Sequence, residues 1–133
     1  MILLDTHVLI WLTEGLRDLG PKARAAADEA LVAGELAVSA ITFWEIAMLE
    51  QKGRIRIIQP LSSYRREILD KGLSEIPLSG ELGIQAARLA QFHSNPADRI
   101  ITATATTFRA TLLTADSRIL DWQSPLRRMD ARS

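Results

Sequence analysis

The sequence predicts an α/β fold, a three-layer α/β/α sandwich around a central parallel sheet. Short apolar runs alternate with segments of helical periodicity along the 133 residues, which is typical of a parallel sheet covered by helices on both faces. The first run, residues 1–4, contains no polar side chain, as expected for a strand that is buried on both faces. The length suits one domain, which we expect to span residues 1–133.

The other elements follow from apolar spacing and from residues that start or stop helices. Further strands are expected at residues 36–38, 73–77 and 111–114, with an edge strand at 126–129. Helices are expected at residues 8–12, from Pro21, at 40–51 with Ser39 as N-cap, at 61–69, from Ser79, from Pro96 and, briefly, from Asp116. Residues 55–58 suit either a strand or a loop.

Composition limits the chemistry available to the protein. Sixteen Lys and Arg balance sixteen Asp and Glu, so a polycationic coat for nucleic acid is absent. The lack of cysteine excludes disulfides, thiolate nucleophiles and cysteine-ligated zinc, and two histidines are too few for an all-imidazole metal site. A bound metal would therefore need oxygen ligands. With no basic leader and no apolar stretch of about 18 residues, we expect a cytoplasmic protein without a membrane segment.

Two acidic residues follow expected strands. Asp5 ends the first strand, and Asp116 lies just past the strand at 111–114. The carboxyl ends of parallel strands form the edge at which ligands bind in such sheets, so both side chains are candidates for a site there. Each of them also suits the N-cap of the next helix, and either position taken alone does not decide between the two roles.

Two further acids lie on expected helices. Glu45 falls on the apolar stripe formed by Ile41, Trp44 and Met48, where an unpaired carboxylate would be costly to bury. We therefore expect Glu45 to be neutral, to be paired or to bind a cation; Lys52 is two helical turns away. Asp98 stands three residues after Asn95 and two after Pro96, which a capped helix start would explain by itself.

The four acids taken together indicate a metal site. Hard dications such as Mg²⁺ bind oxygen ligands, lower the pKa of bound water and stabilise charge that builds on a phosphodiester. Setting the four aside leaves 16 basic residues against 12 acidic ones, a formal excess of four. Candidate contacts for nucleic-acid phosphates form a local basic cluster, which a solvated face would explain equally well: Lys52, Arg54, Arg56, Arg65 and Arg66.

Four segments around these acids resemble one known family. They are LLDTHVLIW at 3–11, SAITFWEIA at 39–47, NPADRII at 95–101 and LLTAD at 112–116. In this order and spacing they resemble PIN-domain endoribonucleases of the VapC type, the toxins of type II toxin–antitoxin modules. The resemblance spans residues 1–133 and implies a single PIN-like nuclease domain.

The resemblance implies roles for particular residues. Asp5 and Asp98 would be the principal ligands of Mg²⁺, with Mn²⁺ as an alternative, while Glu45 and Asp116 would complete the metal shell and help to position the attacking water. The hydroxyls of Thr6 and Thr114 match residues that border the pocket and would hydrogen-bond to the carboxylates.

The other polar residues in these segments carry no assigned role in catalysis. Asn95 is a departure, because many relatives have Asp there; we expect little loss of activity, although substrate or metal affinity can change. His7 and His93 are expected to be structural. Arg99 could pair with a neighbouring acid or with a phosphate, and the sequence does not choose between them.

The resemblance also implies partners. Its members cleave RNA, commonly form homodimers and are inhibited by a cognate antitoxin protein whose C-terminal segment wraps the toxin and often places a basic side chain in the acidic pocket. Candidate apolar contacts for a partner are Trp11, Phe43, Trp44 and Leu49. For Trp44 we expect packing in the core instead.

Other classes of protein fit less well. A phosphoacceptor receiver domain needs an acidic pair after strand one and a lysine after the last strand, but lysines occur only at 22, 52 and 71. A haloacid-dehalogenase-type phosphatase needs Asp-x-Asp, whereas Thr6 and His7 follow Asp5. A non-catalytic binding module and a PIN nuclease of RNA maturation stay open as alternatives.

Overall fold

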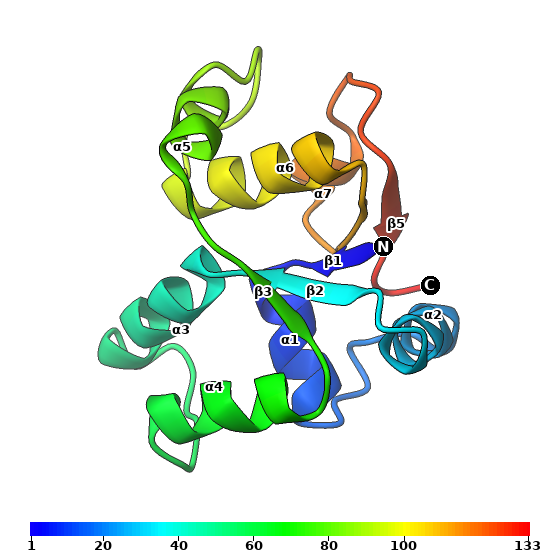
Figure 1. Cartoon of the computed structure of the whole chain (residues 1–133), viewed down its shortest axis with the longest axis vertical. Helices are drawn as coiled ribbons and strands as arrows, with labels where there is room; N and C mark the ends of the chain where they lie inside the picture. Colours follow the sequence, from blue (N-terminus) through cyan, green and yellow to red (C-terminus); the bar gives the residue numbers. More distant parts are fainter.

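The sheet has five strands, all parallel, in the order β3-β2-β1-β4-β5. The computed structural model describes all 133 residues (Figure 1). The strands are β1 (Ile2–Leu4), β2 (Leu36–Ser39), β3 (Ser74–Ile76), β4 (Thr111–Thr114) and β5 (Arg128–Asp130). This confirms the parallel sheet and the first four predicted strands; β5 begins two residues later than expected.

Helices cover both faces of the sheet. They are α1 (Thr6–Thr13), α2 (Pro21–Val32), α3 (Ile41–Gln51), α4 (Leu61–Asp70), α5 (Gly80–Ala87), α6 (Pro96–Phe108) and α7 (Ser117–Leu120). Figure 1 shows α5, α6 and α7 on one side, and α1, α2 and α4 on the other. The three-layer sandwich is therefore confirmed. No helix is both long and apolar enough to cross a membrane.

Two apolar cores flank the sheet, because successive side chains of a strand point to opposite faces. Leu4 and Leu113 pack in the core under α1, α2 and α4, together with Val8, Ala27 and Ile68. Leu3 and Leu112 pack in the core under α5, α6 and α7. The inner strands therefore need apolar side chains toward both faces, which explains the continuous apolar runs of β1, β2 and β4.

Several element boundaries differ from the sequence prediction. Helix α1 begins at Thr6 and not at residue 8, because the Asp5 carboxylate caps it by accepting the Thr6 N–H at 2.9 Å. Ser39 is the last residue of β2 and the N-cap of α3 is Ala40, although the Ser39 hydroxyl accepts the Ile41 N–H at 3.2 Å. Residues 55–58 form neither helix nor strand.

The orientation of α3 was predicted wrongly. Trp44 is 51% exposed and does not pack in the core. The fully buried side chains of this helix are Thr42 and Ile46, so the predicted stripe of Ile41, Trp44 and Met48 is not its buried face. The helix is apolar on several sides, and periodicity alone therefore could not identify the side that faces the protein.

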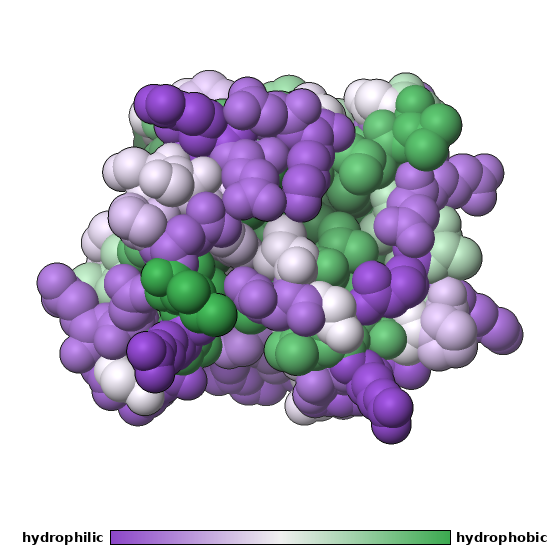
Figure 2. All heavy atoms as spheres, turned by 90° about the horizontal axis from the view of Figure 1, so that it is seen from below, coloured by the Kyte–Doolittle hydropathy of each residue, from purple (hydrophilic) through white to green (hydrophobic).

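The surface carries apolar residues in separate places. Figure 2 views the molecule from the side of α4 and shows a largely hydrophilic face with smaller hydrophobic patches between the polar residues. Among large apolar side chains of the whole chain, Ile58 and Val32 are the most exposed, at 94% and 89%.

Candidate active site

Asp5 lies at the centre of the sheet edge, directly after β1. Its side chain is 7% exposed, and its carboxylate accepts the Thr6 N–H at 2.9 Å and the Thr114 hydroxyl at 2.6 Å. Because β1 and β4 are neighbours, residues far apart in sequence meet here. Burial raises the pKa of Asp5 to about 6, and the charges of Asp98 and Glu45 add to this, while the hydrogen bond from Thr114 opposes it.

The pKa of Asp5 predicts a pH dependence of stability. Folding places a carboxyl group with an ordinary pKa of 3.8 where its pKa is about 6, so the folded state binds the proton more tightly and loses stability as pH rises through this window. In metal-free protein, Asp5→Asn should therefore gain stability relative to wild type between these pH values, by up to about 3 kcal/mol.

Denaturant unfolding of both proteins with chelator at several pH values measures this gain. Asp18→Asn, which changes an exposed acid outside the site, is the matched control. A difference between Asp5→Asn and wild type that does not vary with pH would show that Asp5 carries no such penalty.

Asp98 lies in the first turn of α6 and is 7% exposed. Its backbone N–H donates to the Asn95 side chain at 3.0 Å, which confirms the expected capped helix start. The carboxylate itself remains available for other contacts: its Oδ2 atom lies 2.7 Å from His93 Nε2 and 3.6 Å from Arg118 Nη2. The cap and the site therefore use different atoms of the same residue.

Asp116 is the N-cap of α7 and forms a close pair with Arg118. Its Oδ1 accepts the backbone N–H of Arg118 at 2.9 Å, and its Oδ2 lies 2.9 Å from Arg118 Nη2. Although partial burial acts in the opposite direction, these hydrogen bonds hold the pKa of Asp116 below its usual value. The Thr114 hydroxyl accepts the Asp116 N–H at 3.1 Å and so links this residue to Asp5.

Glu45 reaches the same place from α3 and is half-buried. Burial raises its pKa; the charge of Asp98 adds to the rise, whereas Thr6 and His7 lower it. No ion pair joins Glu45 to Lys52 or to any other basic residue. We expected Glu45 to be neutral, to be paired or to bind a cation, and the structure shows no basic partner for it.

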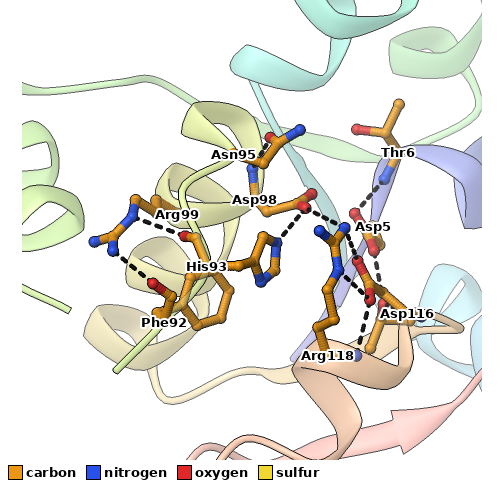
Figure 3. Close-up of polar contacts among 10 residues, drawn as sticks. Asp5, Thr6, Phe92, His93, Asn95, Asp98, Arg99, Asp116 and Arg118 are labelled. Atoms are coloured by element: carbon orange, nitrogen blue, oxygen red, sulfur yellow. Dashed lines mark hydrogen bonds and ion pairs between the residues drawn. The ribbon is translucent and has the colours of Figure 1, made fainter. Parts of the chain in front are cut away.

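The four acids line one cavity of about 340 Å³. Figure 3 shows Asp5, Asp98 and Asp116 facing one another from β1, α6 and the end of β4. The rest of the lining consists of His7, Trp11, Leu49, Arg54, Asn95, Ala115, Arg118 and Arg132. Thus four distant segments bring their carboxylates together at the sheet edge, as the sequence predicted.

The expected hydroxyl residues have different contacts. Thr114 donates to Asp5, as predicted. Thr6 meets Asp5 through its backbone N–H, and its hydroxyl lies 3.3 Å from that of Thr42. Both side chains are fully buried, so they fix the surroundings of the carboxylate without facing solvent.

The predicted basic cluster is divided by the fold. Arg54 lines the acidic cavity. Arg65 is engaged elsewhere, in a two-bond contact with Glu75 at 2.7 and 2.8 Å. Lys52, Arg56 and Arg66 are exposed and line no part of the cavity. Of the five candidates for phosphate contacts, only Arg54 therefore borders the acids.

Two residues beside the acids were not among the predicted site residues: His93, which was expected to be structural, and Arg118. One nitrogen of His93 and one oxygen each of Asp98 and Asp116 lie within 4.8 Å of one another, a spacing that a metal ion could bridge. His93 stacks on Phe92 with ring centroids 4.3 Å apart. The available signal was proximity, since both missed residues lie within five positions of a predicted acid.

Arg99 contacts neither an acid nor the cavity. Its guanidinium donates to the carbonyl oxygens of Phe92 at 2.7 Å, His93 at 2.9 Å and Ala86 at 3.0 Å. These bonds tie the end of α5 and the following loop to the start of α6. The open question about Arg99 is thereby answered: it holds the backbone that carries His93.

The fold and the acidic cavity define a class of protein. Residues 2–122 match the PIN domain family, and the chain belongs to that family. It is 31% identical over 125 residues to Ribonuclease VapC22 of Mycobacterium tuberculosis, an alignment that covers 93% of each chain. These findings confirm the family that the four sequence segments indicated.

Solved structures share the fold. A toxin–antitoxin complex from Klebsiella pneumoniae matches with a TM-score of 0.64 and 23% identity over 98% of both chains. VapBC2 from Rickettsia felis, bound to a DNA fragment from its promoter, matches with a TM-score of 0.64 and 16% identity over 97% of this chain and 98% of that one. At these identities the likeness supports the architecture.

Proposed function

We propose that this protein is a Mg²⁺-dependent endoribonuclease, the toxin of a type II toxin–antitoxin module, and that it acts in the cytoplasm. The observation that carries the proposal is the convergence of Asp5, Glu45, Asp98 and Asp116 on one cavity of a PIN-family chain. The similarity to Ribonuclease VapC22 supports RNA as the substrate.

The residues present fit a hard dication. All four acids offer oxygen atoms, and burial raises the pKa of Asp5 and of Glu45 by penalising their negative charge, which a bound dication would stabilise. Asp5 and Asp98 would be the principal ligands, with Glu45 and Asp116 completing the shell directly or through water. When bound, Mg²⁺ or Mn²⁺ would lower the pKa of a bound water molecule and stabilise the negative charge that builds on the phosphodiester.

The protein's own groups orient these ligands. Thr114 fixes Asp5 through the 2.6 Å hydrogen bond and receives the Asp116 N–H, so one hydroxyl sets the relation between two acids. Asn95 holds the first turn of α6 and therefore the position of Asp98. Glu45, half-buried and without a basic partner, is the group that we assign to orienting the attacking water.

RNA would approach over the basic side chains around the cavity. Arg54 lines it and is our first candidate for a phosphate contact. Lys52, Arg56 and Arg66 are exposed and would contact more distant phosphates. Arg65 would have to give up its pair with Glu75, so we expect it to contribute least.

A cognate antitoxin and a homodimer complete the proposal. The matched structures from Klebsiella pneumoniae and Rickettsia felis are toxin–antitoxin assemblies. Trp11 and Leu49 line the cavity, and Trp44 is exposed on α3. Half-buried Phe43 lies on the same helix as Trp44 and Leu49, and we propose that an antitoxin segment packs on these apolar side chains while a basic side chain enters the acidic pocket.

Cleavage of total cellular RNA by the purified protein tests the proposal. We expect discrete fragments with Mg²⁺ or Mn²⁺ and none with excess chelator, because every candidate ligand is a carboxylate that needs the dication to act. Restoring the metal should restore cleavage. Metal-independent cleavage, or none under any condition, would contradict the nuclease. If RNA is cleaved but no small protein encoded beside the gene inhibits it, the toxin assignment fails instead.

A further inference from the structure

We propose that Arg118 is a built-in counter-ion of the acidic site that competes with the divalent metal for Asp98 and Asp116, and so weakens the metal affinity of the free protein. The inference rests on the proposed metal-dependent function. It concerns a residue that lies outside the acidic quartet.

The geometry places one cation between two acids from different segments. Arg118 Nη2 lies 2.9 Å from Asp116 Oδ2 and 3.6 Å from Asp98 Oδ2, while its Nε lies 3.2 Å from Asp116 Oδ1. Figure 3 shows the guanidinium pointing from α7 toward both carboxylates. Arg118 thus contacts both oxygens of Asp116 and lies near one oxygen of Asp98, so a metal held by these two acids would compete with it for them.

No other arginine or lysine pairs with the four acids. Arg54 and Arg132 also line the cavity, but neither forms an ion pair with Asp5, Glu45, Asp98 or Asp116. Arg132 instead donates to the Ala115 carbonyl at 3.0 Å. Among the arginines and lysines, only Arg118 therefore places its charge within ion-pair distance of the acids, at Asp98 and Asp116.

The contact is suited to being released. The Arg118 side chain is 59% exposed, so water can take over its hydrogen bonds when it leaves, and exposed ion pairs are weak. A dication carries twice the charge and binds the oxygens directly, so it displaces the guanidinium. The metal must however bind those molecules in which Arg118 has left the two acids. The smaller this fraction of molecules is, the weaker the apparent affinity for the metal becomes.

Calorimetric titration with Mn²⁺, without RNA, measures this competition directly. We expect Arg118→Gln to bind Mn²⁺ about five- to tenfold more tightly than wild type, because the competitor and its nearby positive charge are both removed. Arg127→Gln is the matched control: it removes the same charge from an exposed side chain that forms no ion pair. It should bind within about twofold of wild type.

The outcomes separate this inference from the proposed function. Equal or weaker Mn²⁺ binding by Arg118→Gln, with wild type still binding, overturns the role of Arg118 and leaves the metal site standing. Asp98→Asn reports on the site itself and should lose most of the affinity. If Asp98→Asn binds as wild type does, or if no variant binds Mn²⁺, the metal assignment fails and the inference fails with it.

Discussion

Asp98→Asn is expected to slow RNA cleavage by at least about a hundredfold while leaving the fold intact. The metal contributes several kcal/mol of charge stabilisation, and a neutral amide is a much poorer ligand than a carboxylate. The fold should survive, because the cap of α6 uses the backbone N–H of Asp98, which the variant keeps. Asparagine also has nearly the same volume as the carboxylate it replaces.

Cleavage rates at saturating Mg²⁺, together with thermal unfolding of the same samples, check this expectation. Asp18→Asn serves as the control, because it removes the same charge from an exposed position outside the cavity. Wild-type rates in Asp98→Asn would remove Asp98 from the list of metal ligands. A large loss of stability in that variant would mean that the carboxylate supports the fold itself.

Arg99→Met is expected to lower the free energy of unfolding by about 2–4 kcal/mol. Methionine keeps much of the side-chain volume but leaves the carbonyls of Ala86, Phe92 and His93 without their donor. Residues 88–95 contain no helix or strand that could hold them in place. Lysine should restore little, because one ammonium cannot match the forked geometry of a guanidinium.

Denaturant unfolding measures the loss, and Arg88→Met in the same region is the control, because the Arg88 side chain is exposed. Arg99→Met should also lose activity, because the freed backbone would move His93 away from Asp98. A change in stability below about 0.5 kcal/mol would show that the hydrogen bonds of Arg99 are readily replaced by water.

The fold could be predicted because its three inner strands, β1, β2 and β4, carry continuous apolar runs. Leu3 and Leu4 pack on opposite faces, which only a sheet covered on both sides allows. The parallel arrangement then brought Asp5 and Asp116 to one edge, since β1 and β4 are neighbours. Position in the sheet, more than residue type alone, made these two acids predictable.

The remaining features depend on contacts that carry no periodic signal. His93 lies in a loop whose path is set by Arg99, and nothing in the spacing of its residues indicates that path. Arg118 was missed because a basic residue in the first turn of a short helix is ordinary unless the acids beside it are already in place. For α3, Trp44 is apolar but exposed, so the stripe chosen from the sequence was the wrong one.

The hydrogen bond between Thr114 and Asp5 joins residues 109 positions apart, and it has a consequence for synthesis of the protein. A ribosome adds Thr114 109 residues after Asp5, so a growing chain that still lacks β4 has no complete set of carboxylates. The nascent polypeptide is therefore inert until β4 and Asp116 have left the exit tunnel. Translation itself thus delays the moment at which a newly made molecule can attack RNA.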